Sequence, residues 1–194
     1  MHVRTIALMS LLICASGFAA PVFAGQSIDV VDEGGIKDKW MLKEGVPLAV
    51  PAYPPAFVDR KDQVCVSVGY VVRPDGTTSD FTLLKAWNSA SGDDEPVEGY
   101  WMAFASAAGD ALAQWQFQPR PEVKKATPVF TAGTFVFGAT GPDLRAHCRI
   151  ANLSAHLRDL RDHAGRRAPR ILSDLDLRDD ALDSRTAPRV SIDM

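Results

Sequence analysis

The residues most suited to metal chemistry lie close together near the C-terminal end of the sequence. The stretch "AHCRIANLSAHLRDLRDH" contains His147, Cys148, His156 and His163. Imidazole nitrogen and thiolate sulfur are ligands that zinc prefers, but zinc ligands on one helix are usually spaced i, i+4. Here His156 and His163 are seven residues apart. We therefore expect exposed histidines on a helix, and neither a metal site nor any other cofactor.

Two acidic stretches, "VVDEGG" and "SGDDEP", are the other clusters that suggest chemistry. A calcium loop needs further spaced oxygen ligands and a closing glutamate, which neither stretch supplies. The sequence has no Gly-x-Ser-x-Gly elbow and no glycine-rich loop of the kind that holds phosphates. Nothing near Cys65 in the sequence would activate it as a nucleophile. We expect loops and helix starts at the acidic stretches, no catalytic residue and no enzymatic activity.

The composition does not favour nucleic acid as a partner. The chain has 194 residues, a length that fits one domain plus tails. Its net charge is -3, with 46% hydrophobic and 23% charged residues. Such a chain produces no strong electrostatic field, so neither nucleic acid nor an anionic membrane surface is favoured as a partner.

Residues 1–24 have the pattern of a secretory signal peptide. A short basic start, "MHVR", precedes the apolar run "TIALMSLLICASGFAA", and Val22 and Ala24 occupy the -3 and -1 positions of a cleavage site. The run is shorter than the roughly 20 residues that span a membrane. We expect cleavage after Ala24 and export to the periplasm. The alternative is an uncleaved segment that anchors the chain in the membrane.

Export would leave two cysteines, Cys65 and Cys148, in the mature chain. In an oxidising compartment an even pair is most simply one disulfide. The alternative is two buried thiols, which such a compartment disfavours.

Three patterns predict a hairpin, a helix and a further strand. The stretch "VCVSVGYVV" alternates with period two, "RPDG" supplies turn residues, and "TTSDFTLLKAW" resumes a β-prone pattern, which together predict a hairpin. From Val97 to Gln116 apolar residues recur at steps of three and four, as on one face of an α-helix. The stretch "TPVFTAGTFVFGA" predicts a third strand. The resulting order is hairpin, helix, strand.

The helix ends in an unusual sequence, "ALAQWQFQPR". Trp115 closes the apolar stripe, Phe117 starts the chain back across the sheet, and Pro119 prevents further helix. We expect the two aromatic rings to wedge the helix against the sheet.

The remaining segments are expected to lie outside this domain. Residues 25–47 form an N-terminal extension with a possible short strand at "SIDVV". Residues 141–165 suit one amphipathic helix. Residues 166–194 are rich in arginine and aspartate and free of aromatic residues, so we expect a disordered tail.

Four motifs in this order resemble the C-terminal domain family of TonB. They are "PAYPPAF" with Tyr53 and Pro54, the hairpin with its Pro-Asp-Gly turn, "ALAQWQFQP", and the closing strand "TPVFTAGTFVF". The resemblance covers about residues 48–138, within a domain expected at 48–140. The resemblance implies an α+β fold: a three-stranded antiparallel sheet with a helix packed on one face, plus the C-terminal helix and tail. Members of the family work in the periplasm of Gram-negative bacteria and contact outer-membrane transporters.

The sequence departs from the energy transducers of that family. Those proteins carry an N-terminal anchor and a long proline-rich spacer, whereas only about 20 residues separate the apolar segment from the domain here. We therefore expect a stand-alone periplasmic member of the family, with a shortened, anchored transducer as an alternative.

By this resemblance, the third strand would present an exposed edge to a partner. The expected function is a non-catalytic interaction module that binds a protein or extended peptide, such as a segment of an outer-membrane receptor, by strand addition. The residues expected to set this edge are Thr131, Gly133, Thr134 and Phe135. Two alternatives stay open. The edge could be covered by "SIDVV" or by the C-terminal helix, or the domain could be a scaffold or homodimer whose sheet edges pair between copies.

Overall fold

The computed structural model describes residues 28–138, 142–164 and 169–177. The expected signal peptide, most of the expected tail and a few linking residues lie outside these ranges. Within the described ranges, no helix is long and apolar enough to cross a membrane.

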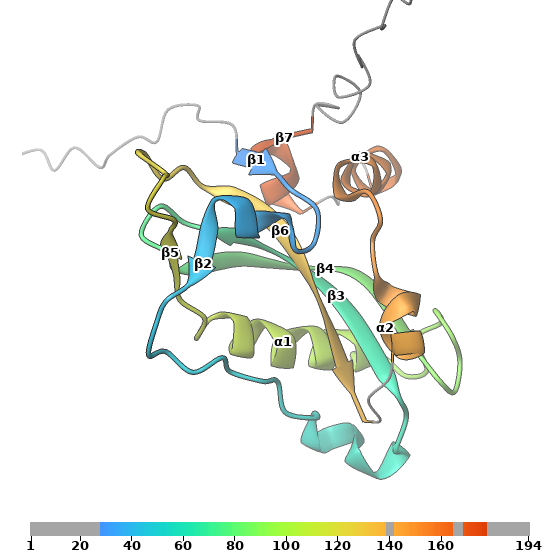
Figure 1. Cartoon of the computed structure of the whole chain (residues 1–194). Helices are drawn as coiled ribbons and strands as arrows, with labels where there is room; N and C mark the ends of the chain where they lie inside the picture. The colour runs from blue at the N-terminus through green and yellow to red at the C-terminus, as the bar shows by residue number, and fades with distance from the viewer. Residues whose placement is uncertain (1–27, 139–141, 165–168, 178–194) are drawn as a thin grey trace, which may run out of the picture.

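A five-stranded sheet forms the centre of the fold (Figure 1). Its strand order is β4-β3-β6-β1-β7, in which β3, β4 and β6 are long and antiparallel while β1 runs parallel to both β6 and β7. The bounds are β1 Ile28–Val30, β3 Val64–Val72, β4 Thr78–Asn88, β6 Val129–Phe137 and β7 Leu175–Asp176.

The other elements lie around this sheet. Strands β2 and β5 form a separate two-stranded antiparallel sheet. The bounds are β2 Trp40–Leu42, β5 Phe117–Pro119, α1 Tyr100–Leu112, α2 Pro142–Cys148, α3 Leu153–Ala164, and the 3-10 helices η1 Gly35–Asp38, η2 Pro55–Arg60 and η4 Arg170–Ser173.

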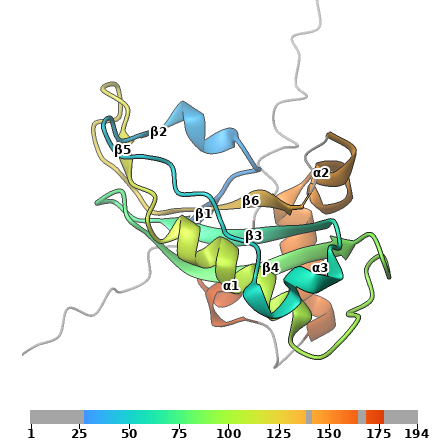
Figure 2. The ribbon, with the colours of Figure 1, turned by 90° about the horizontal axis from the view of Figure 1, so that it is seen from below.

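Helices cover both faces of the sheet, as Figures 1 and 2 show. The alternation of β3 sends Val66, Val68 and Tyr70 into a core shared with Phe104 of α1. The intervening residues face the other way: Val71 joins a second core with Leu153 and Leu157 of α3, and Cys65 joins α2. Period two along β3 therefore fixes the layer order of helix, sheet and helices.

The α+β class and the hairpin predicted from the sequence are confirmed, but the three-stranded sheet is wrong. Two short strands, β1 and β7, extend the sheet beyond β6. The possible strand at "SIDVV" is present as β1, while β7 lies in a segment expected to be disordered. The expected helix on one face is present as α1, and α2 and α3 pack on the opposite face, where the sequence placed no element.

The single helix expected at 141–165 is two helices. Residues between α2 and α3 leave the helical path, and α3 begins with polar capping. The Leu153 N–H donates to Asp32 Oδ1 at 2.7 Å, and the Ala155 N–H donates to Asn152 Oδ1 at 2.8 Å. Because such side-chain acceptors satisfy the free amides of a first turn, the chain starts a second helix there.

The expected disordered tail is ordered at residues 169–177. Leu172, Leu175 and Leu177 are buried in the second core together with Phe130. Three leucines supply enough apolar area to fix a short segment, although its overall composition is rich in charge. The remainder of the expected tail lies outside the described residues.

Candidate functional site

The edge of β6 was the binding site expected from the sequence, and in the structure β6 is an internal strand. It pairs with β3 along its whole length and with β1 at Val129 and Phe130. The chain stays alongside β6 after β1 ends: the Val31 N–H donates to the Phe130 carbonyl oxygen at 3.0 Å. The expectation of a free edge at β6 is therefore wrong at its first residues, because the "SIDVV" segment, named above as an alternative, covers Val129 and Phe130.

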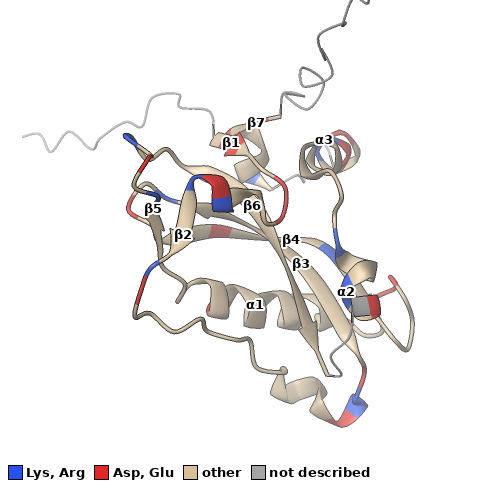
Figure 3. Cartoon of the chain, viewed as in Figure 1, with Lys and Arg blue, Asp and Glu red and all other residues tan. Residues whose placement is uncertain are grey.

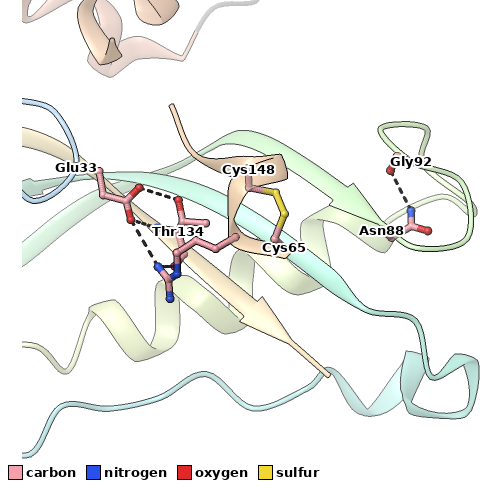
Figure 4. Close-up of a disulfide and its surroundings, with 7 residues drawn as sticks. Glu33, Cys65, Asn88, Gly92, Thr134 and Cys148 are labelled. Atoms are coloured by element: carbon pink, nitrogen blue, oxygen red, sulfur yellow. Dashed lines mark hydrogen bonds and ion pairs between the residues drawn. A yellow bond between two sulfur atoms is a disulfide. The ribbon is translucent and has the colours of Figure 1, made fainter. Parts of the chain in front are cut away.

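Side chains cover β6 beyond the end of β1 (Figure 4). The Thr134 N–H and hydroxyl donate to the two carboxylate oxygens of Glu33, at 2.9 and 2.8 Å. Arg145 of α2 donates to the Thr134 carbonyl oxygen at 2.6 Å and lies 3.7 Å from Glu33. Both backbone polar groups of Thr134 are thus already used, which leaves an added strand no bond at that residue.

The other three residues expected at this edge serve packing and local hydrogen bonding. The Thr131 hydroxyl donates to the Asp32 carbonyl oxygen at 3.3 Å. Phe135 is buried against Trp115, with ring centroids 5.8 Å apart. A methyl group added at Gly133 would meet the rings of Phe135 and Tyr70.

Cys65 and Cys148 form a disulfide between β3 and α2 (Figure 4). Their Cα atoms are 5.9 Å apart, and both residues are fully buried. Next to them, Trp87 and His147 stack with ring centroids 3.9 Å apart. The disulfide holds α2 on the sheet, at the place where Arg145 reaches β6.

The motif residues that carry the resemblance pack around the α1 face. The Tyr53 ring lies edge-on to Phe104, with centroids 5.0 Å apart. Trp115 donates from Nε1 to the Ala49 carbonyl oxygen at 2.8 Å. Phe117 is buried in β5 instead of crossing the main sheet, and Pro119 pairs with Trp40. Pro54 precedes η2.

Asp62 is buried near these residues and accepts hydrogen bonds from two tyrosines. Asp62 is 8% exposed, and its Oδ2 accepts from the Tyr100 hydroxyl at 2.9 Å and from Arg60 Nε at 2.7 Å. The Tyr53 hydroxyl donates to the Asp62 carbonyl oxygen at 3.1 Å. The pKa of Tyr100 is raised by burial and by its bond to Asp62, and burial also raises the pKa of Tyr53. These bonds hold Tyr53, Tyr100 and Arg60 around Asp62, which is what a structural cluster requires.

The raised pKa values of all three tyrosines predict that the protein loses stability at alkaline pH. Burial raises the pKa of Tyr70 as it does those of Tyr53 and Tyr100. A folded pKa above the unfolded value of about 10 gives stability that is complete below pH 10 and is lost as the pH rises further. We expect tyrosinate absorbance to appear together with the loss of circular dichroism. Tyrosinate forming near pH 10 in a protein that keeps its native circular dichroism would contradict this.

The histidines and acidic stretches are not gathered into a site. Among the described residues no three metal-ligating side chains lie together. His156 Nε2 lies 3.1 Å from the Leu84 carbonyl oxygen, and His163 lies 3.2 Å from Asp159. In the second acidic stretch, Glu95 accepts a hydrogen bond from the Trp101 N–H at the start of α1.

The long strand β4 is a sheet edge within the described residues. It has eleven residues and pairs with β3 as its one neighbouring strand, and its last residue, Asn88, also forms a bridge to Gly92. A register shift in this pairing lies near Asp80, whose φ of 57° is left-handed. Such a bulge bends the strand and redirects the side chain that follows, and Phe81 lies against Gly109 of α1. Of the β4 backbone groups, the Leu84 carbonyl oxygen is already contacted by His156.

An apolar groove of about 530 Å³ lies between β4 and α1. Phe81 and Met102 line the groove, and 39% and 62% of their surface is exposed, respectively. The lining residues are Val68, Phe81, Thr82, Leu83, Met102, Ala105, Ser106, Gly109, Asp110, Ala113 and Pro169. The sequence patterns did not predict this groove. The available signal was Met102, an apolar residue outside the apolar stripe of the helix.

Replacing Gly109 by alanine is expected to raise the free energy of unfolding by about 0.5–1 kcal/mol, since glycine is a poor helix former. Gly109 is helical, and the added methyl group would meet Phe81 at 3.6 Å, an ordinary contact. Urea denaturation of G109A beside the unaltered protein measures the change. A lower stability would mean that β4 and α1 are too close here to leave a groove.

Some solved structures are similar to part of this chain. No family model matches the sequence, and no curated protein matches it. A solution NMR structure of the Pseudomonas aeruginosa TonB C-terminal domain is similar over 53% of this chain and 88% of that one, with 20% identity and a TM-score of 0.39. An NMR structure of the Helicobacter pylori TonB C-terminal domain is similar over 47% and 71%, with 18% identity and a TM-score of 0.32. Both are solved domains of the type that the motifs resemble.

Proposed function

We propose that this protein is an exported, non-catalytic interaction domain that binds an extended segment of a partner protein along β4. One observation carries the proposal: an eleven-residue edge strand lies beside an apolar groove. Unpaired N–H and C=O groups at a sheet edge can bond to an added strand, and pockets beside the edge can take its side chains. The geometry supports this edge over β6, whose outer side is occupied.

The half of β4 next to the groove is the proposed contact. Thr78 to Leu83 precede the carbonyl group that His156 contacts, and Phe81 and Leu83 both line the groove. Side chains of an added strand alternate between its two faces, so every second one would point toward α1. Backbone bonding would supply affinity, and the groove would supply selectivity.

The periplasm of a Gram-negative bacterium is the proposed compartment, reached through a cleaved signal peptide. The buried disulfide supports this, because disulfides persist in oxidising compartments. The motif resemblance makes a periplasm-facing segment of an outer-membrane transporter the first partner to test.

The test is a titration of the isotope-labelled mature chain, residues 25–194, with ten-residue peptides taken from periplasm-facing segments of such transporters. Binding along β4 is expected to shift the backbone amides of residues 78–83 and to slow their hydrogen exchange. Shifts confined to other strands would contradict the proposed edge. The absence of shifts with every peptide would contradict the proposed function.

A scaffold or homodimer is the second candidate, because the same edge could pair with β4 of another copy. Sedimentation over a range of protein concentrations measures this. A membrane-anchored form would instead keep residues 1–24, which the intact mass of the exported protein decides.

A further inference from the structure

We infer that residues 189–194 of this chain pair with the edge of β4 when no partner is bound, so that a partner has to displace them. This rests on the proposed function, since it concerns the regulation of the same edge. The segment belongs to residues 178–194, which lie outside the described ranges. Three observations carry the inference: the sequence pattern of the segment, the length of the groove, and the length of the chain that links the segment to β7.

Residues 190–194, "VSIDM", have an apolar side chain at every second position, which is the pattern of a strand with one buried face. Their last three residues follow an apolar–aspartate–apolar pattern that two marginal strands of this sheet also use. The three triplets are Ile28-Asp29-Val30 in β1, Leu175-Asp176-Leu177 at β7, and Ile192-Asp193-Met194. In the two described triplets the apolar residues pack on the second core, and the aspartate is more exposed than they are. The third triplet therefore has a sequence that this fold already uses for short strands.

The groove beside β4 has the length that the apolar face of this segment needs. The Thr78 hydroxyl donates to the Leu112 carbonyl oxygen at 2.7 Å, and further along β4 Phe81 lies against Gly109, so the groove follows β4. The lining residues include Ala105 of α1 and its C-cap residue Ala113, which are about 12 Å apart along the helix axis. In a strand, the first and third of three alternate side chains are about 13 Å apart. Figure 3 shows α1 with very little charge of either sign, which suits the apolar side chains of Val190, Ile192 and Met194.

The linking residues 178–188 are long enough to bring the segment to β4. Strands β7 and β4 are the two ends of the five-stranded order, so four strand spacings, about 19 Å, separate them. The linking residues can span up to about 36–40 Å when extended, which leaves length for a path round one face of the sheet. A tethered segment competes at an effective concentration of about a millimolar, so even weak pairing would fill the edge.

The other strand edges of the described ranges are too short to compete with β4. Strand β7, at the opposite end of the main sheet, has two residues, and β2 and β5 of the small sheet have three each. Strand β4 has eleven residues and lies beside the groove. Because both backbone pairing and apolar contact favour β4, it is the edge that we assign to residues 189–194.

NMR of the isotope-labelled mature chain, residues 25–194, tests the inference without any partner. We expect nuclear Overhauser contacts from the methyl groups of Val190 and Ile192 to the Phe81 ring, and slow hydrogen exchange at outward-facing amides of residues 78–83. The contacts should not change with protein concentration. They should also be absent between labelled and unlabelled copies, because the segment and the edge belong to one chain.

Two double variants with the same added charge separate the segment from its linker. V190D/I192D places carboxylates where apolar side chains are needed, and it is expected to speed exchange of the protected amides at least about tenfold. A181D/L182D adds the same charge to the linking residues and is expected to change exchange less than about twofold. A capped peptide of residues 189–194, added to V190D/I192D, should restore the shifts and the slow exchange. The same peptide with serine in place of valine and isoleucine should not.

The outcomes distinguish the inference from the proposed function. Equal exchange rates in the unaltered protein and both double variants would overturn the inference, as would contacts of residues 190–194 with another strand or only with another copy. The transporter segments are expected to bind V190D/I192D at least about fivefold more tightly than the unaltered protein, because the competing segment is gone. Equal, measurable affinities would overturn the regulation and leave the proposed function in place. Contacts of residues 190–194 with β4, but no binding of any transporter segment to V190D/I192D, would overturn the proposed function and support the inference.

Discussion

Reduction of the Cys65–Cys148 disulfide is expected to lower the free energy of unfolding by about 4.5 kcal/mol. The two cysteines are 83 residues apart in sequence, so the bond closes a long loop in the unfolded chain. In the chain-entropy model this loop closure restricts the unfolded state, and the restriction is lost on reduction. A second contribution comes from α2, which the bond holds against the sheet where Arg145 contacts Thr134.

The measurement is urea denaturation with and without a thiol reductant, started from the unfolded state. Starting there matters because both cysteines are fully buried in the folded protein, which shields the bond from reductant. The dependence of the free energy on urea should also steepen on reduction, since a longer free chain exposes more surface. The control is the double variant C65A/C148A, which should unfold identically in both conditions. Identical urea denaturation curves of the unaltered protein with and without reductant would contradict the presence of the disulfide.

Replacing Gly76 by alanine is expected to lower the free energy of unfolding by about 3–4 kcal/mol. Gly76 has a φ of +83°, which L side chains rarely adopt. An added methyl group would overlap the Phe117 carbonyl oxygen, so the hairpin turn and β5 would have to separate. That separation would break the hydrogen bond from the Phe117 N–H to the Gly76 carbonyl oxygen, now 2.8 Å long, and disturb the packing of a buried ring.

Gly34→Ala is the matched control for that variant. Gly34 has the same φ of +83°, but nothing lies within 4 Å of an added methyl group. The variant G34A should therefore lower the free energy of unfolding by about 1 kcal/mol, the cost of the backbone strain alone. Thermal and urea denaturation of the two variants give the difference, which measures the contact between the hairpin turn and β5. Equal losses in G76A and G34A would mean that this contact contributes nothing.

The local elements of the fold could be predicted from the sequence because each depends on neighbouring residues. The alternation of Val64 to Val72 predicts a strand, and Pro74 to Gly76 predict the turn that follows. The apolar stripe from Val97 onward predicts α1, which the structure places at Tyr100–Leu112. The pairing of Cys65 with Cys148 needed only an even count and an oxidising compartment.

The candidate site could not be predicted, because it depends on which strand ends the sheet. Strand β1 has three residues and β7 has two, too short to show a period, and their parallel pairing joins residues far apart in the chain. By occupying the outer side of β6, the segment at Asp29 to Glu33 removes the edge that the motifs implied and leaves β4 as the long edge of the described sheet.

The sequence by itself determined the hairpin, the main helix, the disulfide and the α+β class, because periodicity and turn chemistry act over a few residues. Only the tertiary structure decided that helices cover both faces, that Leu172 and its neighbours close a second core, and that the apolar groove lies beside β4. The physical reason is that sheet order and groove shape follow from contacts between distant segments. Phe81 and Met102, 21 positions apart, mark the same groove without a shared local pattern.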